Sequence, residues 1–279
     1  MIIHHYTNID VLALILKNHT LRFTRLDQVD DPEESNFICK GVNLGPYTFV
    51  SCWTEVKEES IPMWKMYTKG KWGVRLSFKK DGLFKTYTDY EYKGHDNFIT
   101  EVGKEIHFIL DPKLRWNQTD YMPPFLTDDY DACNFYRKIK YVDDIVPYSD
   151  GCVEFPEDPK TEGIEVKTDK VGSYKNKRWA FQEESRFVMF FAPGNPLAYF
   201  NTEKYIPEQI RQIRAIKNNE GLSFSYYDMN LNEEAFENLV ITMSPLCEPS
   251  QKIMVEALCK QYASSAQIVD SNLSGKLVK

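Results

Sequence analysis

The N-terminal part of the chain switches repeatedly between the two-residue spacing of a strand and the wider spacing of a helix. Residues 9–17 predict a helix, because apolar side chains recur along one stripe of it, at Ile9, Leu12, Ile15 and Leu16. Strands are expected at 2–6, 21–24, 47–53 and 74–78, the last one half-buried. Ser60 and Pro62 predict a short helix, as a cap followed by a first-turn proline, and Gly70 is expected to end it.

Later segments follow the same two periods. Residues 95–136 predict a largely helical insertion that Pro123 and Pro124 interrupt, with Ile109 on its apolar stripe. A short helix is expected at 169–178. Strands are expected at 138–142, 184–191 and 239–243, and a helix at 249–262.

These elements favour one α+β domain spanning 1–279, with the helical insertion near 95–136. The chain has 279 residues, of which 42% are hydrophobic and 27% charged, an ordinary globular balance that disfavours disorder, collagen and coiled coil. No internal repeat, low-complexity segment or convincing linker divides it.

The net charge and the cysteine content exclude some classes of function. The net charge of −7 argues against bulk phosphate binding, which needs clustered cations. Six scattered cysteines without a C-x-x-C motif disfavour a zinc ribbon and fit reduced, buried thiols. The N-terminus has no signal-like region and no apolar run reaches the roughly 20 residues of a membrane span, so we expect a cytoplasmic protein that does not contact a membrane.

The first candidate site is His4-His5-Tyr6-Thr7, at the end of the first predicted strand. Alternation places His5 and Thr7 on one face and Tyr6 on the other. Thr7 stands where a helix cap belongs, and His4 is expected to be exposed. For His5 two interpretations stay open: a buried, satisfied histidine, or a hydrogen-bond donor to a ligand hydroxyl at the strand-to-helix junction.

The second is the acidic run Asp30-Asp31-Pro32-Glu33-Glu34. It fits an acidic turn followed by a helix N-terminus, which favours carboxylates. The spacing of an EF-hand is absent, so no metal site is expected there.

The third candidate is Met63-Trp64-Lys65-Met66-Tyr67, in which the aromatic residues Trp64 and Tyr67 share one helical face. They are either core residues or a short helix that leans over a pocket.

The fourth candidate, Trp179 to Phe187, is the most informative. If a strand begins near Gln182, then Gln182, Glu184 and Arg186 share one face of it. An acid and a guanidinium on a covered strand are either a structural ion pair, or a strand end that emerges into water, or a pair facing a cleft. In the cleft the carboxylate would act as a base or stabilise an oxocarbenium ion, and the guanidinium would hold an anion.

Basic residues nearby form two sets: Lys175, Lys177 and Arg178, and then Arg211, Arg214 and Lys217. The second set is spaced by three and suits one helical stripe. Solvated faces are expected for both, and contact with a nucleotide phosphate or RNA is the open alternative.

Well-known catalytic motifs are absent. No G-x-x-x-x-G-K, G-x-G-x-x-G, G-x-S-x-G or H-E-x-x-H pattern occurs. P-loop NTPases, simple dinucleotide-binding folds, α/β-hydrolases and zincins therefore lose their main support.

Taken together, these motifs resemble a widespread bacterial family described only as a domain of unknown function. The family pattern runs H-Y-T, T-L-R-F, N-D-P-x-E, M-W-x-x-Y, G-V and K-x-x-x-W-x-x-E-x-E-x-R. The matching segments are His5-Tyr6-Thr7, Thr20-Leu21-Arg22-Phe23, Asp30 to Glu34, Met63 to Tyr67, Gly73-Val74, and then Lys175, Trp179, Glu184 and Arg186. Asp30 stands where the family has Asn and Gln182 where it has Glu, so a role that needs two carboxylates is in question.

That layout is in turn similar to the ADP-ribosyltransferase fold, which implies a split mixed or antiparallel sheet with flanking helices. The resemblance implies that NAD is a substrate and that no metal is needed. His5 and Thr7 would hold the nicotinamide ribose, within a cofactor-binding segment that includes Tyr6. Tyr67 or Trp64 would stack on the nicotinamide. Glu184 would be the catalytic carboxylate, assisted by His5 and Tyr67, and Arg22 and Arg186 would bind the pyrophosphate.

Three functions follow as hypotheses. The first is an ADP-ribosyltransferase-like enzyme or NAD glycohydrolase, acting as a bacterial toxin or phage-defence effector, with a protein or nucleic acid as acceptor. The second is another nucleotide- or RNA-processing enzyme. The third is a non-catalytic sensor that binds a nucleotide or a partner protein. Because fold analogy constrains function weakly, the site must decide among them.

Overall fold

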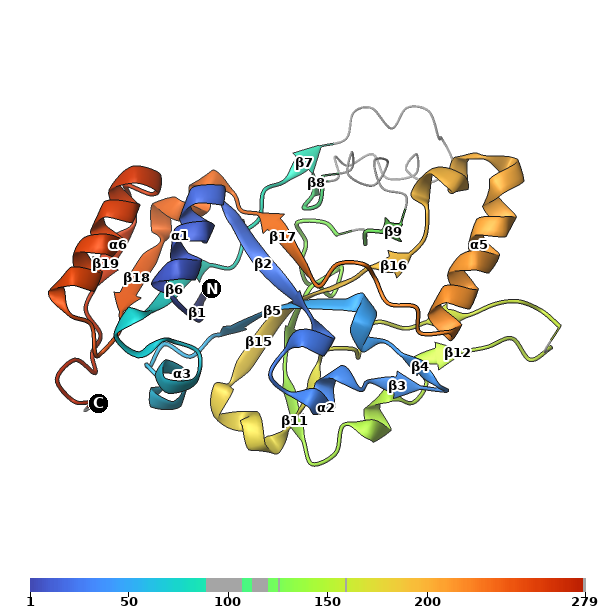
Figure 1. Cartoon of the computed structure of the whole chain (residues 1–279), viewed down its shortest axis with the longest axis horizontal. Coiled ribbons are helices and arrows are strands. Elements are labelled where there is room, and N and C mark those ends of the chain that lie inside the picture. Colours follow the sequence, from blue (N-terminus) through green and yellow to red (C-terminus); the bar gives the residue numbers. More distant parts are fainter. Residues whose placement is uncertain (89–106, 112–119, 125, 159, 278–279) are drawn as a thin grey trace.

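The computed structural model describes residues 1–88, 107–111, 120–124, 126–158 and 160–277. The chain is mixed α+β, and most of its long strands belong to one large sheet (Figure 1). The strands of this sheet are β1 (Ile2–Asn8), β2 (Thr20–Arg25), β5 (Thr48–Thr54), β6 (Gly73–Lys79), β10 (Tyr136–Lys138), β15 (Glu184–Phe190), β17 (Tyr226–Asn230), β18 (Val240–Met243) and β19 (Gln267–Val269).

The sheet runs in the order β10-β15-β5-β1-β6-β18-β19. Its neighbours are antiparallel except for β18 and β19, which are parallel. A second branch, β2 with β17, joins at β5. The strongly apolar strand β15 lies between β5 and β10 and is buried along nearly its whole length, as its sequence predicts.

Strand β5 is where the sheet branches. Thr54 pairs with His4 of β1, whereas Phe49 and Val50 pair with β2. The edge of β5 between these contacts has no strand partner among the described residues, because β1 and β2 diverge from it. The branch therefore leaves an opening beside the middle of β5, and the functional candidates gather there.

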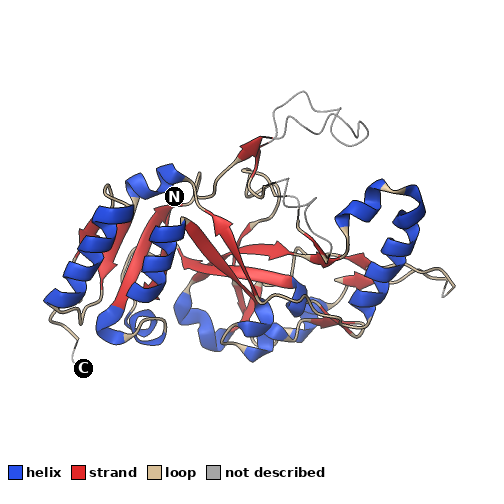
Figure 2. Ribbon diagram, turned by 45° about the horizontal axis from the view of Figure 1, so that its top comes forward, coloured by secondary structure: helices blue, strands red, loops and turns tan. Residues whose placement is uncertain are grey.

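The helices are α1 (Ile9–Asn18), α2 (Pro32–Ser35), α3 (Ile61–Met66), α5 (Thr202–Lys217) and α6 (Pro249–Tyr262). Helices α1 and α6 pack side by side at one end of the sheet, and α5 lies at the other end (Figure 2). The 3₁₀ helices are η1 (Leu26–Gln28), η2 (Gly45–Tyr47), η3 (Gly70–Trp72), η4 (Val146–Ser149), η5 (Lys177–Gln182), η6 (Pro196–Phe200) and η7 (Glu233–Asn238). No helix in the described ranges is long and apolar enough to cross a membrane.

Short strand pairs extend the structure beside the large sheet. They are β3 (Ile38–Cys39) with β4 (Val42–Asn43), β7 (Tyr87–Thr88) with β8 (His107–Phe108), β9 (Tyr121–Met122) with β16 (Ala192–Pro193), β11 (Lys140–Val142) with β14 (Tyr174–Asn176), and β12 (Val153–Glu154) with β13 (Glu165–Val166). The β11–β14 pair is parallel and brings the chain at Lys175 close to β15.

Several local predictions are wrong for identifiable reasons. Helix α1 is capped by Asn8, not Thr7, because β1 keeps pairing with β6 through Asn8 and the Asn8 side chain accepts the first helical N–H groups. Helix α3 ends at Met66, before Gly70. Strand β6 is buried on both faces rather than half-buried. The segment 138–142 divides into the end of β10 and the separate strand β11.

The predicted helix at 169–178 is also wrong. Gly172 adopts a positive φ of 71°, which interrupts a right-handed helix, and the following residues form β14 and η5. Within 95–136 the described parts form turns and the strands β8, β9 and the start of β10 rather than helix. The remaining residues of that predicted insertion lie outside the described residues. Of helix α5, the sequence predicted only the helical stripe of Arg211, Arg214 and Lys217, without the bounds of the helix.

We predict that Leu12→Ala destabilises the protein by about 2–5 kcal/mol, because it leaves a cavity beneath α1. Leu12 is 0% exposed, whereas Leu14 on the same helix is 52% exposed. The matched variant Leu14→Ala should therefore leave the free energy of unfolding nearly unchanged. Urea denaturation of the two variants checks this, and equal losses would contradict the packing of α1.

Candidate active site

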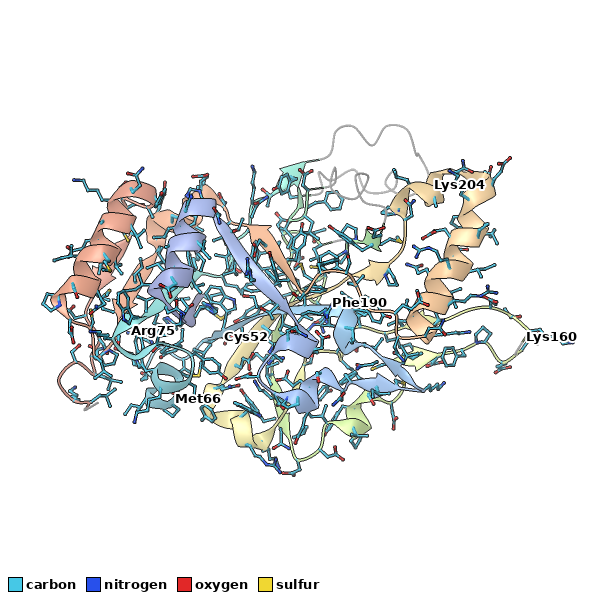
Figure 3. The ribbon with its side chains drawn as sticks, in the orientation of Figure 1. Cys52, Met66, Arg75, Lys160, Phe190 and Lys204 are labelled. Atoms are coloured by element: carbon cyan, nitrogen blue, oxygen red, sulfur yellow. The ribbon has the colours of Figure 1, made fainter. Side chains whose placement is uncertain are left out.

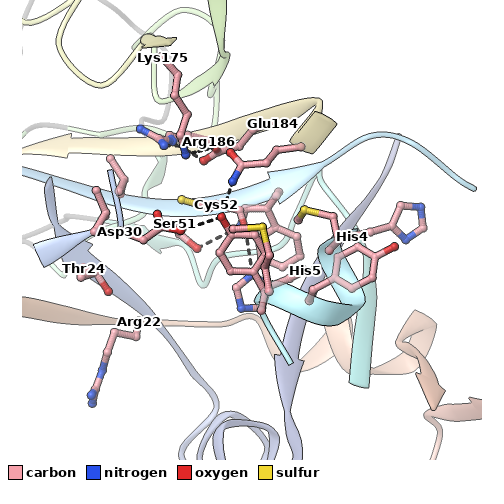
Figure 4. A pocket seen from close by; sticks show the side chains of 18 of the residues that line it. His4, His5, Arg22, Thr24, Asp30, Ser51, Cys52, Lys175, Glu184 and Arg186 are labelled. Carbon is pink, nitrogen blue, oxygen red and sulfur yellow. Dashed lines mark hydrogen bonds and ion pairs between the residues drawn. The ribbon is translucent and has the colours of Figure 1, made fainter. Parts of the chain in front are cut away.

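A cavity of about 420 Å³ lies in the opening where the sheet branches. Its size is that of a small-molecule pocket. Figure 4 shows Lys175, Glu184 and Arg186 together along one wall and Arg22 on the opposite side. The lining residues are His4, His5, Tyr6, Arg22, Thr24, Gln28, Val29, Asp30, Val50, Ser51, Cys52, Trp53, Met63, Met66, Tyr67, Lys175, Gln182, Glu184 and Arg186.

His5 bridges the diverging strands. Its Nδ1 lies 2.8 Å from the backbone carbonyl oxygen of Cys52, at the edge of β5 that has no strand partner within the described ranges. Cys52 lies near the centre of the molecule (Figure 3). A carbonyl oxygen only accepts, so Nδ1 carries the proton and Nε2 keeps its lone pair. This tautomer makes His5 an acceptor toward the cavity, whereas the sequence predicted a donor. Burial lowers the pKa of His5, partly offset by this hydrogen bond, and the ring stays neutral near pH 7.

The rim of the cavity is organised around the Tyr67 hydroxyl. Tyr67 caps the C-terminal end of α3, and its hydroxyl donates to Asp30 Oδ2 at 2.8 Å. The Gln182 side-chain amide donates to the same hydroxyl. Burial, and then the hydrogen bond to Asp30, raises the pKa of the phenol, so it keeps its proton. Three distant segments are thereby joined at one oxygen, and the orientation of the Tyr67 ring is restrained.

At this wall, two carboxylates and two cations form a buried network, of which Lys175, Glu184 and Arg186 line the cavity and Glu34 does not. Lys175 Nζ lies 3.2 Å from Glu34 Oε1 and 3.2 Å from Glu184 Oε2. The Arg186 guanidinium donates to both carboxylates, with Nη2 at 3.0 Å from Glu34 Oε1. All four side chains are at most 5% exposed. Their charges sum to zero, as burial of ions requires.

This network fixes the charge of each member. Burial alone would raise the pKa of Glu184, but Arg186 and Lys175 outweigh burial and hold that pKa well below its usual range. Burial also opposes the charge of Arg186, and the two carboxylates outweigh it and raise its pKa. Burial, followed by the nearby Glu184, raises the pKa of the Cys52 thiol. Glu184 is therefore a fixed anion, and Cys52 is an uncharged thiol rather than a nucleophile.

Arg22 is the cation on the far wall. It comes from β2, its side chain is 48% exposed, and it binds Asp228 of β17 through Nε and Nη2 at 2.8 and 2.9 Å. Its guanidinium also lies over the Tyr226 ring, 3.7 Å from the centroid. These contacts hold the guanidinium against β17, directed away from Glu184 and Arg186 (Figure 4), and Nη1 has no hydrogen-bond partner in the described part of the chain.

Most of the residues singled out in the sequence come together at this cavity. His5, Tyr6, Arg22, Tyr67, Glu184 and Arg186 line it. Thr7 and Trp64 do not. Trp64 packs edge-on against Tyr6 at 5.1 Å between ring centroids, and its indole N–H donates to Glu59. Thr7 is buried within β1.

Sequence reasoning missed several contributors. Lys175 was expected on a solvated face but is buried in the ion network, whereas Lys177 and Arg178 are exposed. His4 was expected to be exposed but is 6% exposed, with Nδ1 at 2.7 Å from Ser77 Oγ. Glu34 looked like one member of an acidic turn. The only early signal for it was its place in the D-P-x-E motif.

Comparison with known proteins adds no relative. No family model matches the chain, and no curated protein or solved structure matches it significantly.

Glu34→Gln is expected to destabilise the fold by about 3–5 kcal/mol, because it leaves two buried cations facing a single carboxylate. The matched control is Glu162→Gln, which breaks an exposed pair with Arg214 and should leave the free energy of unfolding essentially unchanged. Chemical denaturation at pH 7 compares the two variants. A Glu34 variant as stable as the control would contradict the buried network.

Stability should also fall as the pH drops below about 6.5. Burial, and then the nearby Arg75, lowers the pKa of His4 to about 4, and burial lowers that of His5. Between pH 6.5 and 4 the unfolded chain therefore binds more protons than the folded one, so acid favours unfolding. His4→Gln should reduce the loss of stability between pH 7 and pH 5, measured by urea denaturation. An unchanged loss would argue against a buried neutral His4.

Proposed function

We propose that the protein is an ADP-ribosyltransferase-like enzyme that cleaves NAD between nicotinamide and ribose. The observation that carries this proposal is the shared cavity. His5 of the first strand, Tyr67 after α3 and Glu184 of the late strand β15 line one cavity although they are far apart in the sequence. This is the trio that the resemblance to the ADP-ribosyltransferase fold implies for ribose, nicotinamide and the ribosyl cation. The sheet that branches at β5 also supports a split sheet of that type.

The hydrogen-bonding pattern suits a nucleoside. His5 Nε2 presents a lone pair, so its ligand must donate a hydrogen bond, as a ribose hydroxyl does. The Gln182 side chain is 3% exposed, and its Oε1 is buried without a hydrogen-bond partner. It is therefore a second acceptor on the lining. A buried acceptor left unpaired costs free energy that a ligand N–H or O–H would recover.

The electrostatics suit cleavage of a glycosidic bond. As nicotinamide leaves, positive charge develops at the ribose anomeric carbon, and an anion fixed beside it stabilises the transition state. Lys175 and Arg186 keep Glu184 ionised and hold it in one orientation. Because those contacts exist before any ligand binds, the carboxylate need not reorganise during the reaction.

The pyrophosphate is assigned mainly to Arg22. Arg186 uses four of its N–H groups on Glu34 and Glu184, which leaves one N–H on Nη1. Arg22 lines the cavity, its side chain is half exposed, and its Nη1 has no partner among the described residues. Its guanidinium is anchored by Asp228 and Tyr226, so little side-chain freedom is lost on binding a phosphate.

One observation favours a second candidate, a sensor that binds a nucleotide without cleaving it. Glu184 and Arg186 satisfy each other and their neighbours, as members of a purely structural network would. A sensor and an enzyme differ in one product, free nicotinamide, which only the enzyme releases.

Glu184→Gln should reduce nicotinamide release from NAD about 100- to 1000-fold, because a neutral amide cannot stabilise the ribosyl cation. The KM for NAD should change only a few-fold. Liquid chromatography of the products gives the rate. The adjacent exposed Glu183 does not line the cavity, so Glu183→Gln is the matched control and should retain activity.

Circular dichroism must show that each variant is folded, and Glu184→Asp serves if the glutamine variant is not. Wild-type protein that binds NAD but releases no nicotinamide would favour the sensor. A Glu184→Gln variant that is folded and as active as the wild type would overturn the catalytic role of Glu184.

A further inference from the structure

Two carboxylates line the cavity in the described part of the chain, Asp30 and Glu184. They differ in how their oxygens are used. Both oxygens of Glu184 accept hydrogen bonds from the buried cations. Asp30 is exposed at the rim and uses only Oδ2, which accepts from Tyr67. Its Oδ1 has no hydrogen-bond or ion-pair partner among the described residues.

The side chain of Asp30 is nevertheless oriented. The Gln182 amide donates a hydrogen bond to the Tyr67 hydroxyl, and that hydroxyl donates a hydrogen bond to Asp30 Oδ2. A phenol has one proton, so this chain of hydrogen bonds has a single direction that ends on the carboxylate. The contact restrains one oxygen of Asp30 and leaves the other free at the open side of the cavity.

We propose that Asp30 is the general base that activates the nucleophile, a role that rests on the proposed cleavage of NAD. The bond between nicotinamide N1 and ribose C1′ breaks, and its electron pair leaves with neutral nicotinamide. The oxygen of water, or of an acceptor hydroxyl, forms a new bond to C1′. Its proton passes to Asp30 Oδ1 and then to solvent, which balances the lost positive charge of the nicotinamide ring.

The other groups of the cavity are less suited to take this proton. Glu184 is stabilised as an anion by two buried cations, so protonating it would break that balance. His5 is a neutral imidazole at a buried position, where a second proton would create an unpaired cation. Gln182 cannot act as a base. Asp30 is reached from solvent, the side from which water or an acceptor enters.

The two carboxylates therefore act on different steps, and two assays separate them. Exchange of labelled nicotinamide into NAD requires cleavage and its reversal, and the nucleophile of the reversal, nicotinamide N1, carries no proton that a base must remove. Hydrolysis requires cleavage and capture by water. Asp30→Asn keeps an oxygen that can accept from Tyr67 but removes the base, so it should reduce hydrolysis about 100-fold while exchange stays within a few-fold of wild type.

Controls make the outcome specific. Glu33→Gln alters an exposed carboxylate nearby that does not line this cavity, and both of its rates should match wild type. Asp30→Ala should recover hydrolysis when formate is added as a substitute base. If Asp30→Asn loses both exchange and hydrolysis, or keeps both, the proposal for Asp30 is wrong. The proposed cleavage of NAD is tested separately: it is still supported if Glu184→Gln loses both reactions. If wild-type protein shows neither reaction, both proposals fail.

Discussion

Four buried charges at one wall of the cavity hold together parts of the chain that are remote in sequence. Glu34 comes from α2, Lys175 from β14, and Glu184 and Arg186 from β15. Removing an ion from water costs several kcal/mol, and each of these ions is tolerated only because its partners are present. The network therefore fixes where β14 and α2 lie against β15, and with them the wall of the cavity.

The branch in the sheet supplies the space that this wall encloses. Strands β1 and β2 leave β5 in different directions, and the Cys52 carbonyl at the gap is satisfied by the His5 side chain rather than by a strand. A backbone group that must be paired thus determines the tautomer of the histidine. The same contact leaves the imidazole with a lone pair for a ligand, so a structural requirement of the sheet determines the chemistry of the cavity.

Local sequence patterns predicted the helices and strands better than they predicted which side chains would pair across the fold. The buried stripe of α1, the apolar run of β15 and helix α6 were visible because each depends on its own sequence. Lys175 was misread as solvated. Glu34 lies in the first turn of a helix, as the acidic run predicted, but its burial was missed, since the burial of both residues depends on ion partners far along the chain. The segment around Gly172 failed for a backbone reason, a positive φ inside a stretch with helical spacing. The gathering of His5, Tyr67 and Glu184 was expected only through the family resemblance.

We propose that one cavity holds the nicotinamide half of NAD between the first strand and β15. A crystal structure of the Glu184→Gln protein soaked with NAD tests this proposal most directly. We expect the ribose hydroxyls within hydrogen-bond distance of His5 Nε2, the nicotinamide ring against Tyr67 and the pyrophosphate toward Arg22. Density for NAD elsewhere on the molecule, or an empty cavity at millimolar NAD, would contradict it.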